Sequence, residues 1–155
     1  MKREIKFRGK RIDSGEWIYG SLVGIDDTAV IVDHRDFSCN PLTDVNSFWF
    51  DMENNEVDPD TVGQYTGLKD KNGREIYEDD IVKWDDCSGG KYWRFAVVKY
   101  DPDIQFDCTP IPGVNGVRNS YTHTFDFGTF AYKDTHNYLE IIGNIHDNPE
   151  LIKPE

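Results

Sequence analysis

Cysteine and long apolar runs are scarce in this sequence of 155 residues. Its three cysteines, Cys39, Cys87 and Cys108, are odd in number and widely spaced, so they match neither a disulfide framework nor a C-x-x-C motif. No window approaches the roughly 18–20 apolar residues of a transmembrane helix. The basic N-terminus lacks the apolar segment that follows it in a signal peptide. These absences predict a protein of a reducing cytoplasm with no membrane span.

Basic residues are also few, because 17 Lys and Arg stand against 29 Asp and Glu, a formal net charge of −12. Such a chain repels phosphate backbones and has few cations to release counterions from nucleic acid. The exception is residues 1–12, the basic segment, in which six basic side chains accompany one acid, Glu4. Either it contacts an acidic partner, such as nucleic acid or the acidic face of a second subunit in a homo-oligomer, or it is the solvent-facing side of an edge strand. We favour the edge strand.

Short alternating segments separated by turn residues predict a mainly β fold with little helix. The predicted strands cover residues 5–8, 16–23, 28–32, 48–50, 62–65, 74–84, 92–100, 122–132 and 138–145. The acidic segment 51–60 predicts a connector, in which Asp60 is a possible cap for one helical turn. We therefore expect an N-terminal β meander in residues 1–56 and a second β region in residues 57–155. Asn148 before Pro149 predicts a short terminal helix.

A tight hairpin is predicted around Asn72-Gly73, because this pair tolerates positive φ. The run that begins at Asp70 also looks like a calcium loop, but its glycine stands at position 4 rather than 6, and Ile81 replaces the bidentate glutamate. The four histidines show no ligand spacing either. We expect no metal site. The strand after this turn should place Ile76, Ile81, Val82 and Trp84 in the core.

Catalytic chemistry has weak candidates. Glu78, Asp79 and Asp80 are the best carboxylate group, yet neighbours on a strand point to opposite faces. We expect a turn whose like charges are relieved by Lys83 or Arg74, and catalysis by Glu78 and Asp80 is a remote alternative.

Nucleophiles are no better placed, because the sequence lacks a G-x-S-x-G elbow, a phosphate loop and a dinucleotide fingerprint. Cys87 follows Asp85 and Asp86, whose charges disfavour its thiolate. We predict no enzymatic activity and no cofactor.

Aromatic and basic side chains alternate in residues 84–100, which makes this stretch a candidate surface for single-stranded nucleic acid. The stacking candidates are Trp84, Tyr92, Trp93, Arg94, Lys99 and Tyr100. Small β-barrels bind single strands by stacking bases on aromatics beside positive charge. In the other interpretation, which the net charge favours, the aromatics are core and the charges face solvent.

The run TVGQYTGLKDKNGREIYEDDIV, residues 61–82, resembles the signature of the YopX family, which comprises small proteins of phages and prophages. The signature residues, whose role we expect to be structural, are Gly63, Gln64, Tyr65, Thr66, Gly67, Asn72, Gly73, Ile76, Tyr77 and Asp80. Residues 5–22 and 142–151 resemble the start and end of the family. The family commonly has glycine where Asp79 stands, and aspartate is a tolerated substitute if that position requires positive φ.

The resemblance implies an N-terminal β subregion, an SH3-like small β-barrel after the signature, and phage or prophage origin with a setting in the bacterial host cytoplasm. It implies no reaction. We predict an accessory protein that binds a macromolecule, first of all another protein, through exposed strand edges. The alternatives are single-stranded nucleic-acid binding through residues 84–100 and an acidic decoy that mimics DNA.

Overall fold

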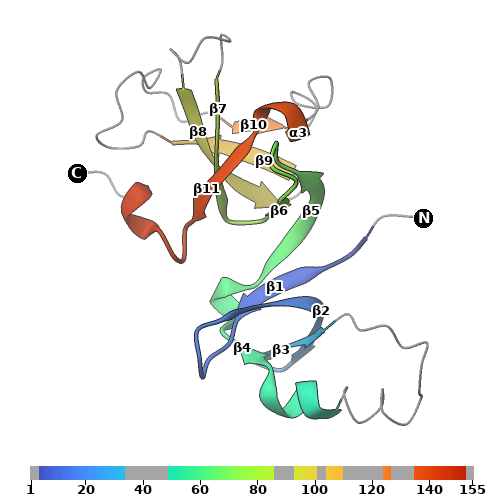
Figure 1. Ribbon diagram of the computed structural model, residues 1–155. Helices are drawn as coiled ribbons and strands as arrows, with labels where there is room; N and C mark the ends of the chain where they lie inside the picture. Colours follow the sequence, from blue (N-terminus) through green and yellow to red (C-terminus); the bar gives the residue numbers. More distant parts are fainter. Residues whose placement is uncertain are drawn as a thin grey trace. The chain divides into compact units, whose positions relative to one another are not determined.

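The structure, a computed structural model, describes residues 4–33, 49–85, 93–100, 104–109, 124–126 and 135–152. The chain divides into two compact units, unit 1 at Met1–Tyr65 and unit 2 at Thr66–Glu155. Strands dominate the described residues of both units, so the mainly β prediction is confirmed (Figure 1). In this part of the chain no helix has the length and apolar character needed to cross a bilayer. The division falls at Tyr65, whereas the sequence placed it after residue 56.

Unit 1 is an antiparallel sheet in the order β4-β3-β2-β1-β5. Its elements are β1 (Phe7–Lys10), β2 (Trp17–Ile25), β3 (Thr28–Asp33), β4 (Glu56–Val57), η1 (Pro59–Thr61) and the start of β5 (Gly63–Lys69). The first three strands are neighbours in the sheet, which confirms the predicted meander. Its core contains Ala29, Ile31 and Val57, with Phe7, Ile18 and Val62 packed against them.

The basic segment does not form an edge strand, and that prediction is wrong. Strand β1 lies between β2 and β5, so it has a partner on both sides. The expected alternation also fails, because Arg8 is only 6% exposed whereas Ile5 is exposed. Pairing with segments distant in sequence therefore places this strand in the middle of the sheet.

Residues 49–54 form a short helix, which corrects the strand predicted at 48–50. The backbone N–H of Asn55 donates to the Asp51 carbonyl at 2.8 Å. The Asp51 carboxylate accepts a bond from the N–H of Asp33 at the end of β3, at 3.2 Å. The helix thus closes against the edge of β3, which period-two patterning does not reveal.

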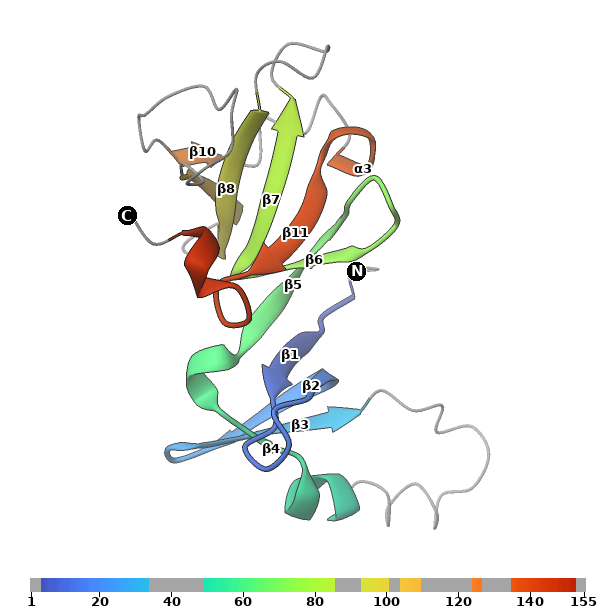
Figure 2. The ribbon, with the colours of Figure 1, turned by 60° about the vertical axis from the view of Figure 1, so that its left-hand side comes forward.

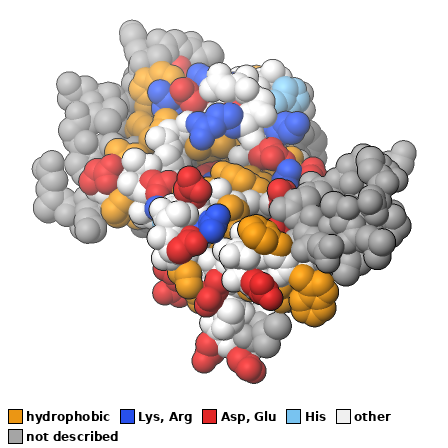
Figure 3. All heavy atoms as spheres, turned by 60° about the horizontal axis from the view of Figure 1, so that its bottom comes forward, with side chains coloured by type: hydrophobic (Ala, Val, Ile, Leu, Met, Phe, Trp, Pro, Cys, Tyr) orange, Lys and Arg blue, Asp and Glu red, His pale blue; other side chains and the backbone are white. Residues whose placement is uncertain are grey.

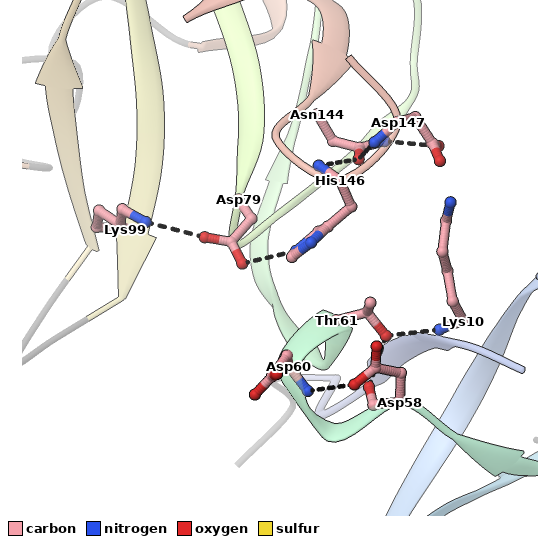
Figure 4. A network of polar contacts seen from close by, with 9 residues as sticks. All are labelled: Lys10, Asp58, Asp60, Thr61, Asp79, Lys99, Asn144, His146 and Asp147. Atoms are coloured by element: carbon pink, nitrogen blue, oxygen red, sulfur yellow. Dashed lines mark hydrogen bonds and ion pairs between the residues drawn. The ribbon is translucent and has the colours of Figure 1, made fainter. Parts of the chain in front are cut away.

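The 3-10 turn η1 is capped by Asp58 and not by Asp60, the possible cap in the sequence. The Asp58 side chain accepts a hydrogen bond from the Asp60 N–H at 3.0 Å, and Pro59 occupies the first turn. Thr61 then accepts from the N–H of Lys10 on β1 at 2.9 Å, so the turn is tied to the sheet of unit 1 (Figure 4).

Unit 2 contains an antiparallel five-stranded sheet in the order β10-β9-β8-β7-β11 (Figure 2). Its elements are the end of β5, β6 (Glu75–Tyr77), β7 (Asp80–Asp85), β8 (Trp93–Tyr100), β9 (Ile104–Cys108), β10 (Thr124–Asp126), α3 (Thr135–Tyr138), β11 (Glu140–Asn144) and η2 (Pro149–Leu151). The turn η2 confirms the predicted terminal helix. The described strands end at β10 and β11 without closing, so an SH3-like barrel stays a prediction.

Both faces of β7 and β8 are buried. One core cluster contains Val82, Trp84, Ala96, Val98 and Phe106 among others, and a second contains Ile81, Phe95 and Val97. The four predicted core residues Ile76, Ile81, Val82 and Trp84 are all buried, as expected. Each such side chain contributes about 1.5–3 kcal/mol through burial.

The predicted strand 74–84 is broken into β6 and β7 by a turn at residues 78–79. Asp79 has a φ of 70°, which is outside the extended region that strand residues with a side chain normally adopt. The preceding hairpin turn is confirmed, because Gly73 has a φ of 80° and its N–H donates to the Asp70 carbonyl at 3.0 Å.

Candidate functional site

Asp79, one of the three candidate catalytic carboxylates, links several elements of unit 2. The Asp79 N–H donates to the Val98 carbonyl at 2.8 Å, and its carbonyl accepts from the Ile145 N–H at 3.0 Å. Its carboxylate lies 3.0 Å from Lys99 Nζ and 3.1 Å from His146 Nε2 (Figure 4). Asp79 therefore joins β8 and the turn after β11.

The charge of Asp79 in this turn is offset by Lys99, whereas the sequence suggested Lys83 or Arg74 for the turn. Lys83 instead lies 3.4 Å from the Glu140 carboxylate. Both oxygens of Asp79 are therefore engaged, one by the Lys99 ammonium and the other by the His146 ring. Among the described residues, no three His, Cys, Asp or Glu side chains gather in a way that could hold a metal ion.

The turn after β11 orients His146 through Asn144. The Asn144 Oδ1 accepts hydrogen bonds from the N–H groups of His146 at 3.0 Å and Asp147 at 2.9 Å. Its Nδ2 donates to the Asp147 carboxylate at 3.0 Å (Figure 4). The side chain of one asparagine thus replaces backbone partners and fixes the turn.

Two further acidic side chains of the signature serve the backbone. Asp70 is 1% exposed and accepts hydrogen bonds from the N–H groups of Asn72 and Arg74, both at 2.9 Å, and of Ile141 at 3.1 Å. Asp80 accepts from the Tyr77 N–H at 2.8 Å. Buried carboxylates with such donors hold turns and strand ends in place.

The other signature residues lie along β5 and β6 and in the turn between them. Gly63 and Gln64 pair with β1, and Gly67 has a φ of 85°. Thr66 donates its hydroxyl to the Ile76 carbonyl at 2.7 Å. Tyr65, Ile76 and Tyr77 are buried. The geometry of the signature is that of a scaffold.

The stacking candidates do not share one open face. Trp84 is 6% exposed and packs in the core cluster with Val98, so its ring presents no face to a nucleotide base. Trp93 packs against the other cluster, with Lys83 Nζ 4.9 Å from its ring centre. Along β8, Trp93 and Lys99 lie on one face of the strand, and Arg94 and Tyr100 lie on the other.

Tyr92 lies outside the described residues, and Lys99 is paired with Asp79. The arrangement of the remaining stacking candidates favours the core interpretation. Nucleic-acid binding by this stretch stays a prediction that a gel shift with labelled oligonucleotides at low salt would test.

The basic segment engages aromatic rings within unit 1. Lys6 Nζ lies 5.4 Å from the ring centre of Tyr65, Arg8 Cζ lies 4.6 Å from that of Trp17, and Lys10 Nζ lies 5.5 Å from the same ring. Each contact has cation–π geometry, worth about 0.5–2 kcal/mol depending on exposure. These cations stabilise the sheet, which a pattern of charges alone does not reveal.

Large apolar side chains are exposed mainly on unit 1. They are Ile5, Ile12, Tyr19, Leu22, Trp49 and Phe50. In the described part of unit 2, Tyr138 is the one exposed side chain of this class. Figure 3 shows hydrophobic side chains reaching the surface with acidic ones between them. A chain with few apolar residues therefore leaves several of its largest ones in solvent.

A small hollow lies beside β2. The register of β2 with β3 begins at Gly20↔Asp33, so residues 17–19 of β2 extend beyond the end of β3. The hollow has a volume of about 260 Å³. Its lining residues are Trp17, Ile18, Tyr19, Ile31, Asp33 and Asn55. We call it the β2 hollow. Sequence reasoning missed it, although three large side chains in succession at 17–19 are unusual for a strand with one solvent face.

Residues 6–153 match the family model described as YopX protein. The chain belongs to the YopX family. A crystal structure of protein EF1440 from Enterococcus faecalis resembles it at 21% sequence identity, covering 97% of this chain and 99% of that chain, with a TM-score of 0.53. At that identity the likeness concerns the fold alone. No curated protein matches the chain.

The YopX signature, residues 61–82, is part of the scaffold of this fold. In this YopX chain the residues that carry the family likeness hold turns and strands, as Asp70 and Asp80 do. The exposed apolar groups and the β2 hollow lie in unit 1, for the most part outside that signature. Scaffold and candidate contact surface are thus different parts of the sequence.

Proposed function

We propose that this YopX protein is a non-catalytic accessory protein that binds another protein through unit 1. The observation that carries the proposal is the set of exposed large apolar side chains there, with Tyr19 44% exposed. Exposed apolar side chains of this size are candidates for an interaction site. Tyrosine and tryptophan, which this set includes, are enriched among residues that dominate binding energy.

A contact through side chains replaces the predicted contact through strand edges. Along β3, the N–H of Ile31 donates to the Asn55 carbonyl at 3.1 Å, and that of Asp33 donates to Asp51. On β11, the N–H of Ile141 donates to Asp70. Edge donors that already have partners are poor templates for an added strand.

The proposed phage or prophage origin, the bacterial cytoplasm as setting and the SH3-like closure of unit 2 rest on the family resemblance. A homo-oligomer stays a proposal as well, in which the basic segment pairs with an acidic surface of a second copy; Lys6, Arg8 and Lys10 of this segment also lie over Tyr65 and Trp17.

The experiment is affinity capture from host cells with the tagged chain, followed by identification of the retained protein and a binding assay with that protein once purified. Replacing Tyr19 by alanine should weaken binding at least tenfold, because its side chain is exposed on β2. Tyr138→Ala, which removes an exposed aromatic of unit 2, is the matched control and should bind as the unaltered chain does.

Equal binding by the β2 variant and the control would contradict the proposal. A salt series distinguishes the acidic-decoy alternative, since decoy binding collapses as salt screens the net charge of −12, whereas apolar contacts persist.

A further inference from the structure

We propose that the short helix at residues 49–54 docks a basic surface of a protein partner, in which lysine or arginine side chains surround an apolar patch. The docking surface, called the helix face, consists of Trp49, Phe50 and Glu53. The inference rests on the proposed function and deepens it, because it names the segment of unit 1 that meets the partner and the chemistry of that partner.

The helix inverts the usual amphipathic pattern, in which apolar side chains are buried and polar ones face solvent. Trp49 and Phe50 are each 59% exposed, whereas Asp51 is 0% exposed. The buried side of the helix is therefore polar, and two adjacent aromatic side chains remain outside. Folding of unit 1 does not account for these aromatic residues, but a contact with a partner does.

Hydrogen bonds fix the backbone that carries the two rings. The Asp51 carbonyl accepts from the Asn55 N–H at 2.8 Å, and its carboxylate accepts from the Asp33 N–H at the end of β3. Asn54 Nδ2 donates to the Phe50 carbonyl at 2.8 Å. The helix accordingly lies against the sheet of unit 1 (Figure 2). An aromatic pair on a fixed backbone loses little conformational freedom when it binds.

Glu53 brings a carboxylate next to the exposed rings. It follows Phe50 by three positions and Trp49 by four, and residues at these spacings are neighbours on a helix. Its side chain is exposed. A lysine or arginine of a partner can lie over an aromatic ring while its charged end meets this carboxylate, and its methylene groups cover the ring.

The charge around the helix face selects a basic partner. Residues 49–60 contain five acidic residues and no basic one. Three of these acids, Glu53, Glu56 and Asp60, are exposed, and among the described residues none of the three forms an ion pair. A basic surface supplies the missing cations, whereas nucleic acid and anionic lipid meet repulsion. A second copy brings the same net charge of −12.

The test is an NMR titration of the full isotope-labelled chain with a short amphipathic peptide that has leucine on one face and lysine on the other. In one comparison peptide glutamate replaces lysine, and in a second serine replaces leucine. The leucine and lysine peptide should shift the signals of residues 49–56 and should bind at least about tenfold more tightly than either comparison peptide. Equal binding of the serine peptide, or shifts centred on other residues, would overturn the inference.

Two variants of the helix face test its residues. Phe50→Ala and Glu53→Gln should each weaken binding of the leucine and lysine peptide at least about fivefold, and both replaced side chains are exposed, so the fold should persist. The matched controls are Tyr138→Ala and Asp27→Asn, which remove an exposed aromatic of unit 2 and an exposed charge of the β2–β3 turn. Equal losses in the controls would show that the net charge binds the peptide and would overturn the assignment.

Sedimentation of the chain without peptide separates a second copy from a basic partner. The helix face should leave the chain unassociated through this surface, so Phe50→Ala should sediment as the unaltered chain does. Self-association that Phe50→Ala abolishes would assign the helix face to a second copy and overturn the inference.

This inference and the proposed function fail separately. If the captured partner loses affinity for Tyr19→Ala but not for Phe50→Ala or Glu53→Gln, protein binding through unit 1 stands and the helix face falls. If the peptide binds the helix face as expected but no captured protein depends on Tyr19, the helix face stands and the proposed function falls.

Discussion

Asp79 holds a backbone conformation that favours glycine, and it also makes contacts that glycine lacks. Its φ is 70°, and its carboxylate meets Lys99 and His146. Alanine at this position has the strain without the contacts. We therefore expect Asp79→Ala to be less stable than Asp79→Gly by about 1 kcal/mol, and both to be less stable than the unaltered chain. Urea unfolding at pH 7 measures the difference.

Asp26 is the matched control, because it also has positive φ, 50°, and is exposed at the β2–β3 turn. The alanine and glycine variants of Asp26 should differ by a similar amount, but Asp26→Gly should cost little or nothing relative to aspartate. If Asp79→Gly is as harmless as Asp26→Gly, the bonds to Lys99 and His146 do not stabilise the fold.

The stability of unit 2 depends on pH through Glu140. The hydrogen bond from Lys71 at 2.9 Å, with the charge of Lys83, holds the pKa of Glu140 below its usual value of 4.5. Folding thus favours the ionised form, so the stabilisation is present above about pH 4.5 and is lost as pH falls through the lowered pKa.

Glu140→Gln should accordingly reduce the free energy of unfolding by at most about 1 kcal/mol at pH 7, with the difference vanishing in acid. Chemical unfolding from pH 7 to pH 3 measures it, and Lys71→Gln should reproduce part of the effect. If the difference in the free energy of unfolding between the unaltered chain and Glu140→Gln grew in acid, the contact of Glu140 with Lys71 would not be its source.

At the scale of elements, Asp51 closes the edge of β3. Its side chain is 0% exposed and accepts the Asp33 N–H. Asp51→Ala leaves that donor without its acceptor, which should cost about 1–3 kcal/mol. It also frees part of the edge for another chain, so we expect self-association that increases with protein concentration. Thermal unfolding and sedimentation at several concentrations measure the two effects.

Glu53→Ala, on the same short helix but exposed, should change neither stability nor association appreciably. If Asp51→Ala and Glu53→Ala had the same stability and the same tendency to associate, Asp51 would not protect the edge of β3.

The sequence predicted correctly those elements that depend on the residues of a turn. The hairpin at Asn72-Gly73 formed because glycine accepts the positive φ that the turn requires. The continuous strand predicted through Asp79 did not form. Asp79 adopts the left-handed conformation, and a period-two pattern of residues does not reveal this. The helix at 49–54 was missed since its Asp51 accepts a hydrogen bond from Asp33 of β3, eighteen residues away in sequence.

The whole molecule carries a net charge of −12, and self-repulsion opposes its compact state. Raising sodium chloride from about 10 mM to about 300 mM shortens the Debye length from roughly 30 Å to below 8 Å. We expect the melting temperature to rise, because screened repulsion outweighs the few weakened ion pairs. Calorimetry in chloride and in sulfate separates screening from the general stabilisation by sulfate. A falling melting temperature in chloride would mean that ion pairs dominate.

The sequence by itself determined the β class, the turn at Gly73, the YopX membership and the tolerance of Asp79 for positive φ. These depend on local backbone preferences and on a contiguous run of residues. Only the tertiary structure decided that the basic segment lies inside a sheet, that residues 49–54 form a helix and that the β2 hollow exists. The physical reason is strand pairing, because register brings together side chains such as Arg8, Trp17 and Tyr65 whose separation in sequence says nothing of their contact.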